Sequence, residues 1–163
     1  MERSNGGGAA ERELRAEAVF DAEPLEIWAV LTDFGRLARS SPELLGMRPL
    51  LPGGLRVGQQ YVALNRRKAV VWPTRSVITG LEVGRLLAWD TRSSGARWIW
   101  ELEPMPDGGT RVVHRRPVPR SLTRLSDVFA TVLLGGAASH ADELEAAMAV
   151  TVERLREAVE VSS

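Results

Sequence analysis

From about residue 45 to residue 118 the chain carries six short segments of strand-forming residues, and no helical pattern separates them. Turns rich in Gly, Pro, Asn and Asp join these segments, because such residues supply the backbone angles that tight turns need. Strands so close in sequence, without crossover helices, predict an antiparallel meander. We place the strands near 45–51, 57–66, 69–79, 85–91, 96–105 and 109–118.

A seventh strand precedes the meander. From Glu13 to Phe20 apolar and other residues alternate, which is typical of a strand with one buried face. The next segment predicts a helix, because Pro24 suits the first helical turn and Ile27, Trp28 and Leu31 form an apolar stripe. This helix is expected to end near residues 34–35, and the segment GRLARSSPELLG to hold one more helical turn.

Two helices are predicted after the last strand. The first begins at Ser121 and ends at the glycine pair 135–136, and the second runs from about Ser139 to about Glu160. The second helix is strongly amphipathic, so it is the natural cover for the apolar face of the sheet. A strongly curved sheet around one helix often leaves a gap between the two. The apolar stripe of the second helix consists of Leu144, Met148, Val152, Leu155 and Val159.

Length and composition limit the function classes. The chain has 163 residues, which fits a flexible tail at 1–12 and one domain at 13–161. It has 21 basic and 21 acidic residues, so charge gives no reason to expect nucleic acid or an anionic membrane as the partner. There is no cysteine, and the two histidines have no clear carboxylate partners, so we expect no metal and no cofactor. No signal peptide or membrane span is recognisable, and we expect a cytoplasmic monomer or homodimer.

The hairpin RWIWELEPMPDGGTRVVHRR holds the most informative residues. Strand side chains alternate between faces, and Leu102 lies between two glutamates, so Trp98 and Trp100 should share its inward face. On the returning strand, the outward parity of Arg111 and Arg115 favours Val112 and His114 as inward. Arg116 falls on the inward parity too, and a bulge would reverse the assignment.

Five segments of the chain resemble a known superfamily when they are taken in order. These segments are FDAEPLEIWAVLTDF, LRVGQQY, GRLLAW, LEPMPDGGTRVVH and ELEAAMAVTVERLREAVE. Over roughly residues 13–160 the chain resembles the helix-grip superfamily (SRPBCC), which includes START domains, Bet v 1-like proteins and polyketide cyclases/dehydrases. The resemblance implies an α+β helix-grip fold: a seven-stranded, curved antiparallel sheet wrapped around a long C-terminal helix. It also implies an internal cavity and small, largely hydrophobic ligands.

In such a fold the inner face of the sheet is the cavity wall, so inward residues are ligand-binding candidates as well as core candidates. Two tryptophans and one polar handle are the usual build of a small-molecule site. Arg75 faces inward only if Val77 does, and otherwise it is a solvated charge; a bulge at Pro73 would bring Trp72 inward instead. The ligand-binding candidates are Trp98, Trp100, Trp89, Trp72, Asn65, Met148 and His140, and the catalytic candidates are His114, Arg75 and Tyr61.

Two functions fit these residues. The first is polyketide cyclase/dehydratase chemistry, in which the cavity restricts the conformers of a polyketone and His114 transfers protons. Arg75 or Tyr61 would then stabilise an oxyanion. The second is non-catalytic binding or transport of a lipid or aromatic metabolite, which needs only the cavity. A co-chaperone-type interaction module is a third, weaker alternative that the resemblance also allows.

Overall fold

The computed structural model describes residues 12–118 and 137–162, and within 137–140 it describes the backbone alone. The described residues form one seven-stranded antiparallel sheet and three helices, in the order β1 (Leu14–Phe20), α1 (Pro24–Leu31), α2 (Phe34–Ser40), β2 (Leu44–Pro49), β3 (Gln60–Arg67), β4 (Val70–Glu82), β5 (Leu86–Thr91), β6 (Ala96–Pro104), β7 (Thr110–Arg116) and α4 (Ala137–Val161). Across the sheet the strand order is β1-β7-β6-β5-β4-β3-β2. The predicted α+β fold and the antiparallel meander are confirmed.

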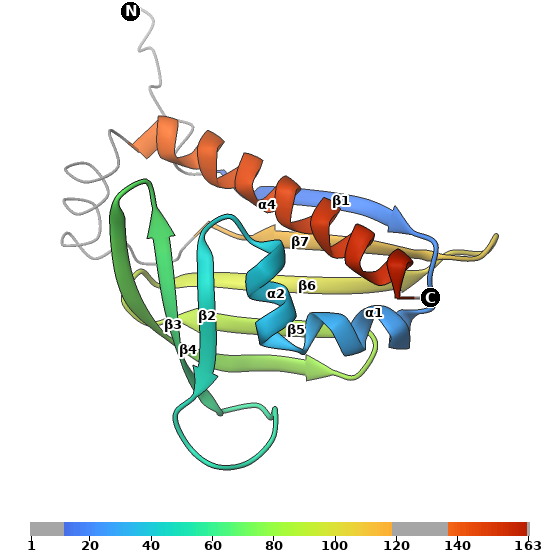
Figure 1. Cartoon of the computed structure of the whole chain (residues 1–163), viewed down its shortest axis with the longest axis horizontal. Coiled ribbons are helices and arrows are strands. Elements are labelled where there is room, and N and C mark those ends of the chain that lie inside the picture. The colour runs from blue at the N-terminus through green and yellow to red at the C-terminus, as the bar shows by residue number, and fades with distance from the viewer. Residues whose placement is uncertain (1–11, 119–136, 163) are drawn as a thin grey trace, which may run out of the picture.

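The helices cover one face of the curved sheet, which we call the inner face (Figure 1). α4 runs along β1 and β7, while on the same face α1 contacts β6 and α2 contacts β2. The predicted apolar stripe of α4 is buried along its whole length, from Leu144 to Val159. None of the described helices combines the length and apolar character that a membrane-spanning segment requires.

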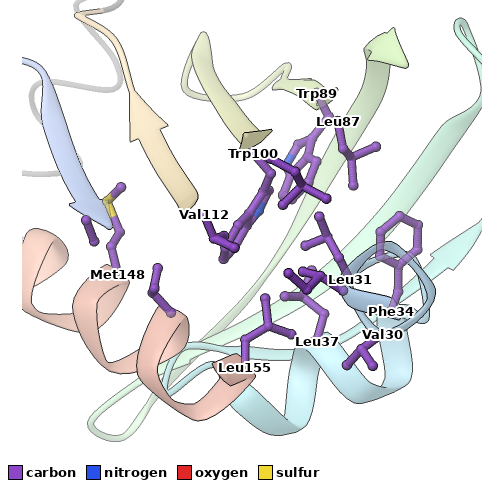
Figure 2. Packing of buried hydrophobic residues seen from close by; sticks show 14 of the residues in the cluster. Val30, Leu31, Phe34, Leu37, Leu87, Trp89, Trp100, Val112, Met148 and Leu155 are labelled. Carbon is purple, nitrogen blue, oxygen red and sulfur yellow. The ribbon is translucent and has the colours of Figure 1, made fainter. Parts of the chain in front are cut away.

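The core lies between the inner face and the helices. Figure 2 shows Trp89 and Trp100 pointing from the sheet toward the side chains of α1, α2 and α4, among them Leu31 and Leu155. These residues belong to one cluster that also holds Met148 of α4. Burial of this much apolar surface is the main favourable term in folding, so α4 is part of the core and not an appendage.

The outer face carries the charged residues of the same strands. Arg111 pairs with Glu17 at 3.0 Å, and Arg115 pairs with Glu13 at 2.8 Å and with Glu101 at 3.1 Å. These residues alternate with the buried ones, so the parity predicted for β6 and β7 is confirmed. Each such exposed pair adds little to stability, but together they satisfy the outward charges.

Several predicted boundaries were wrong, for local reasons. The helix expected to reach residue 34 ends at Leu31, where the Thr32 hydroxyl donates to the Trp28 carbonyl at 2.7 Å. Asp33 then caps α2 by accepting a hydrogen bond from the Arg36 N–H at 3.2 Å. β3 begins three residues later than predicted because Gly58, with φ +88°, turns the chain. The helix predicted from Ser121 lies outside the described residues.

The turn between β6 and β7 yields a stability prediction. Gly108 and Gly109 both have positive φ, but only at Gly109 would an added Cβ meet the Phe20 carbonyl oxygen, at 2.7 Å. We expect Gly108→Ala to cost about 1–2 kcal/mol from backbone strain, and Gly109→Ala to cost about 1–3 kcal/mol more from the steric conflict. Chemical denaturation of both variants measures the difference. Equal losses would contradict the close approach of this turn to β1.

Candidate ligand-binding site

Strands β6 and β7 bring three aromatic side chains together on the inner face. The register places Trp100 opposite His114, and their rings stack with centroids 3.8 Å apart at 12°. Trp98 continues the stack, with its ring centroid 5.7 Å from that of His114 at 22°. The inward orientation predicted for these three residues is confirmed. Their predicted roles in ligand binding and catalysis stay predictions.

His114 is held as a buried, neutral imidazole. Its Nδ1 lies 3.1 Å from the Ile99 carbonyl oxygen, and because a carbonyl can only accept, Nδ1 carries the proton. Burial lowers the pKa of His114 to about 4, and the hydrogen bond to Ile99 offsets this only in part. At neutral pH the side chain is therefore uncharged, which makes it a weak base rather than an acid.

Exposure increases along this stack. Trp100 is 1% exposed and His114 is 5% exposed, whereas Trp98 is only partly buried although it lies on the same face. Arg116 follows at the end of β7, and its Cζ lies 5.5 Å from the centroid of the Trp98 ring. The buried aromatic stack thus ends in a partly exposed tryptophan beside a guanidinium.

Polar side chains gather around this end of the inner face. We call Glu43, Asn65, Arg67, Trp98 and Arg116 the polar end. Asn65 of β3 donates to the Thr74 hydroxyl at 2.9 Å, and Arg67 forms an ion pair with Glu143 of α4. Figure 1 shows that the β3–β4 hairpin curls toward the beginning of α4, which brings Arg67 close to Glu143.

Glu43 joins the polar end from just before β2. Burial raises the pKa of its carboxyl group, and the charges of Arg67 and Arg116 oppose this effect. Burial likewise lowers the pKa of the Arg116 guanidinium, and Glu43 opposes it. The Arg116 Nε is buried and has no hydrogen-bond partner in the part of the chain that the structure describes. The polar end therefore holds charges that are partly removed from water.

Three of the other predicted residues lie in the packed core. Tyr61 makes an edge contact with Phe34 at 5.0 Å, and burial raises the pKa of its phenol, so it stays a neutral donor. Trp89 and Met148 are 8% and 2% exposed. Their packing is with neighbouring side chains, and ligand contact by any of them stays a prediction.

The two alternatives for β4 are resolved. Ser76 and Ile78 are buried, so Trp72 shares the inner face and Arg75 is exposed on the outer face. Of the two alternatives for Arg75, the solvated outer-face charge is therefore the one observed, and the catalytic role suggested for an inward Arg75 has no geometric basis. Trp72 faces inward, but the expected bulge at Pro73 does not occur. Strand β4 pairs with β3 without interruption at Pro73, and its pairing with β5 begins only at Ser76, so the proline fits there without a bulge. The register shift lies instead between Ile78 and Gly80.

Two further expectations concern positions away from the stack. His140 lies in the first turn of α4, where its side chain is outside the described residues. Among the side chains that the structure does describe, no group of three or more His, Asp or Glu could hold a metal ion. A hollow of about 360 Å³ lies between α2 and β2, and its lining, which includes Arg39, Leu45 and Arg48, contains none of the predicted site residues.

Sequence reasoning missed the charged members of the polar end. The alternation of side chains along β7 predicts that Arg116 faces inward. A charged residue at an inward position, however, indicates a bulge as much as it indicates a site. Arg67 and Glu43 are brought near Arg116 only by the curvature of the sheet. A short-range pattern carries no information about that curvature.

The sequence matches a family model over residues 11–160, and the family is described as polyketide cyclase / dehydrase and lipid transport. The protein belongs to this family. No curated protein matches the sequence.

Solved structures show the same fold at low sequence identity. The aromatase/cyclase Zhui from Streptomyces sp. R1128 is 17% identical, with 91% of this chain and 93% of that chain covered and a TM-score of 0.69. Protein NE0264 from Nitrosomonas europaea is 14% identical, with 94% and 97% covered and a TM-score of 0.66. The Polyketide_cyc-like protein Cgl2372 from Corynebacterium glutamicum is 18% identical, with 92% of each chain covered and a TM-score of 0.60. The helix-grip fold is thus confirmed.

The buried imidazole makes stability depend on pH. In the unfolded chain His114 regains a pKa near 6.5, so between pH 6.5 and 4 the unfolded state binds a proton that the folded state excludes. The contribution is complete above pH 6.5 and is lost as the pH falls toward 4, by about 3 kcal/mol. We expect wild type to lose that much unfolding free energy relative to His114→Gln over this interval. Urea denaturation of both proteins as a function of pH checks this, and parallel curves would contradict it.

Proposed function

We propose that the protein binds a small aromatic or hydrophobic molecule at the polar end of the inner face. The supporting observation is the partial exposure of Trp98. Its inner-face neighbours Trp89 and Trp100 are 8% and 1% exposed, so the aromatic surface is closed in the core, and among the described residues it is partly exposed at Trp98 and, on β4, at Trp72. An accessible indole on a face that is otherwise core is a stacking surface for a ligand.

The surroundings of Trp98 suit such a ligand. Small-molecule sites combine apolar and aromatic walls with a few polar groups that fix orientation. Here His114 stacks on Trp98 from within the core, and Arg116 stands beside it. These groups give the site both an apolar surface and polar contacts.

The family supports the same ligand class. Its description joins polyketide cyclases and dehydrases to lipid transport, and both activities concern small, largely apolar molecules. Binding is the part common to the two activities. Ligand binding is therefore the function that we propose first for this chain.

Cyclase/dehydratase chemistry is the second candidate, and one observation favours it. His114, neutral at pH 7, lies against Trp98, next to the proposed ligand position. A neutral imidazole can accept a proton through Nε2, but a pKa about 4 makes it a weak base. Restriction of the substrate's conformers would then supply most of the rate.

The binding proposal is tested with 2-naphthol, a neutral aromatic probe. We expect Trp98→Ala to weaken its affinity by roughly tenfold, because the stacking surface is lost. Ile99→Ala is the control, since Ile99 is the next residue of β6 and points to the other face. Titration calorimetry measures both variants. Unchanged affinity in Trp98→Ala, or equal losses in the two variants, would contradict the proposed position.

The catalytic candidate is tested with linear polyketones. Mass spectrometry of the protein incubated with them would detect bound compound, and extracts would reveal a product that has lost water. If His114 is the base, His114→Gln should keep binding nearly intact and lower turnover by about 100-fold or more. Conversion at the wild-type rate by the variant would remove His114 from the mechanism. Binding without conversion by either protein would leave the carrier function.

A further inference from the structure

Arg116 is a charged inner-face residue whose hydrogen-bonding capacity is not used by the described residues. It is the last residue of β7 and lies opposite Leu14 of β1, which is 1% exposed. Its Nε is buried without a hydrogen-bond partner, and no ion pair joins Arg116 to another described residue within 4.0 Å. A buried donor of this kind costs free energy unless a partner satisfies it.

The neighbouring arginines are paired. On the outer side of β7, Arg111 contacts Glu17 and Arg115 contacts Glu13. Across the polar end, Arg67 is held by Glu143 of α4. The lack of a partner at Arg116 is therefore specific to its position and not a general feature of arginines in this part of the fold.

The charges around Arg116 do not supply the missing partner. Glu43 interacts with it through space but forms no ion pair with it among the described residues. Arg67 and Glu143 compensate each other, and His114 is neutral at pH 7. A single positive charge thus lies over the partly exposed Trp98 ring, and its buried Nε has no hydrogen-bond partner among the described residues.

We propose that Arg116 binds the carboxylate of an aromatic carboxylic acid whose ring packs against Trp98. The guanidinium is a planar fork that matches a carboxylate with two parallel hydrogen bonds. Because its Cζ lies 5.5 Å from the centroid of the Trp98 ring, the carboxylate must be attached directly to the ring system or by a short link. This inference rests on the proposed function and adds the chemical class of the ligand to it.

The charge of Glu43 provides a second test of the proposal. A ligand carboxylate at Arg116 would come close to the Glu43 carboxylate, and the two would repel each other. Burial already raises the pKa of Glu43, so its protonated form is accessible when the ligand binds. Removing the Glu43 charge should therefore strengthen binding of the acid and leave binding of a neutral analogue unchanged.

The test compares 2-naphthoate with 2-naphthamide, which have nearly the same shape and differ in charge. With the wild-type full chain, calorimetry should give tighter binding of the acid. We expect Arg116→Gln to weaken the acid by roughly 10- to 100-fold and to leave the amide unchanged. Arg75→Gln is the matched control, because Arg75 is exposed on the outer face. Circular dichroism verifies that each variant is folded.

Each outcome separates the inference from the function on which it rests. If wild type binds both probes equally, or Arg116→Gln weakens both alike, carboxylate recognition is overturned while aromatic binding stands. If wild type binds neither probe, both proposals fail. Should Arg116→Gln not fold, Glu43→Gln decides: several-fold tighter binding of the acid alone supports the inference, and equal effects on acid and amide overturn it.

Discussion

The structure depends on covering one apolar face of a single antiparallel sheet. A strand exposes alternate residues to each side, so the inner face collects the apolar residues of seven strands and must be shielded from water. α4 supplies most of the shield with one apolar stripe, and α1 and α2 supply the rest (Figures 1 and 2). Because one helix cannot match a curved sheet everywhere, the quality of the cover varies along the inner face.

This variation in how well the helices cover the inner face distinguishes the closed core from the proposed site. Trp100 and His114 form a tight stack that is closed to water, and the imidazole is kept neutral by its burial. One residue pair further along, Trp98 and Arg116 continue the same stack but are only partly covered. The same alternation that builds the core therefore delivers an aromatic surface and a positive charge to its open end. We propose that a ligand binds to this partly covered surface.

The sequence predicts those features that depend on local periodicity. The parity of Trp98, Trp100 and His114, the stripe of α4 and the order of strands follow from side-chain alternation, and all agree with the structure. Two kinds of feature cannot be predicted from local periodicity. The inward turn of Trp72 instead of Arg75 depends on register, which a long strand with a shift after Ile78 does not reveal. The meeting of Glu43, Arg67 and Arg116 depends on sheet curvature, which brings together residues far apart in the chain.

The most direct test of the account is to locate a bound aromatic ligand with the five tryptophans as reporters. Each indole N–H gives one NMR signal, which single Trp→Phe variants would assign. On titration with 2-naphthoate, the account predicts a large shift of the Trp98 signal, with Trp28 and Trp89 almost unmoved. A ligand that shifts Trp28 or Trp89 and spares Trp98 would contradict it, since the ligand would then lie in the region that the structure describes as packed core.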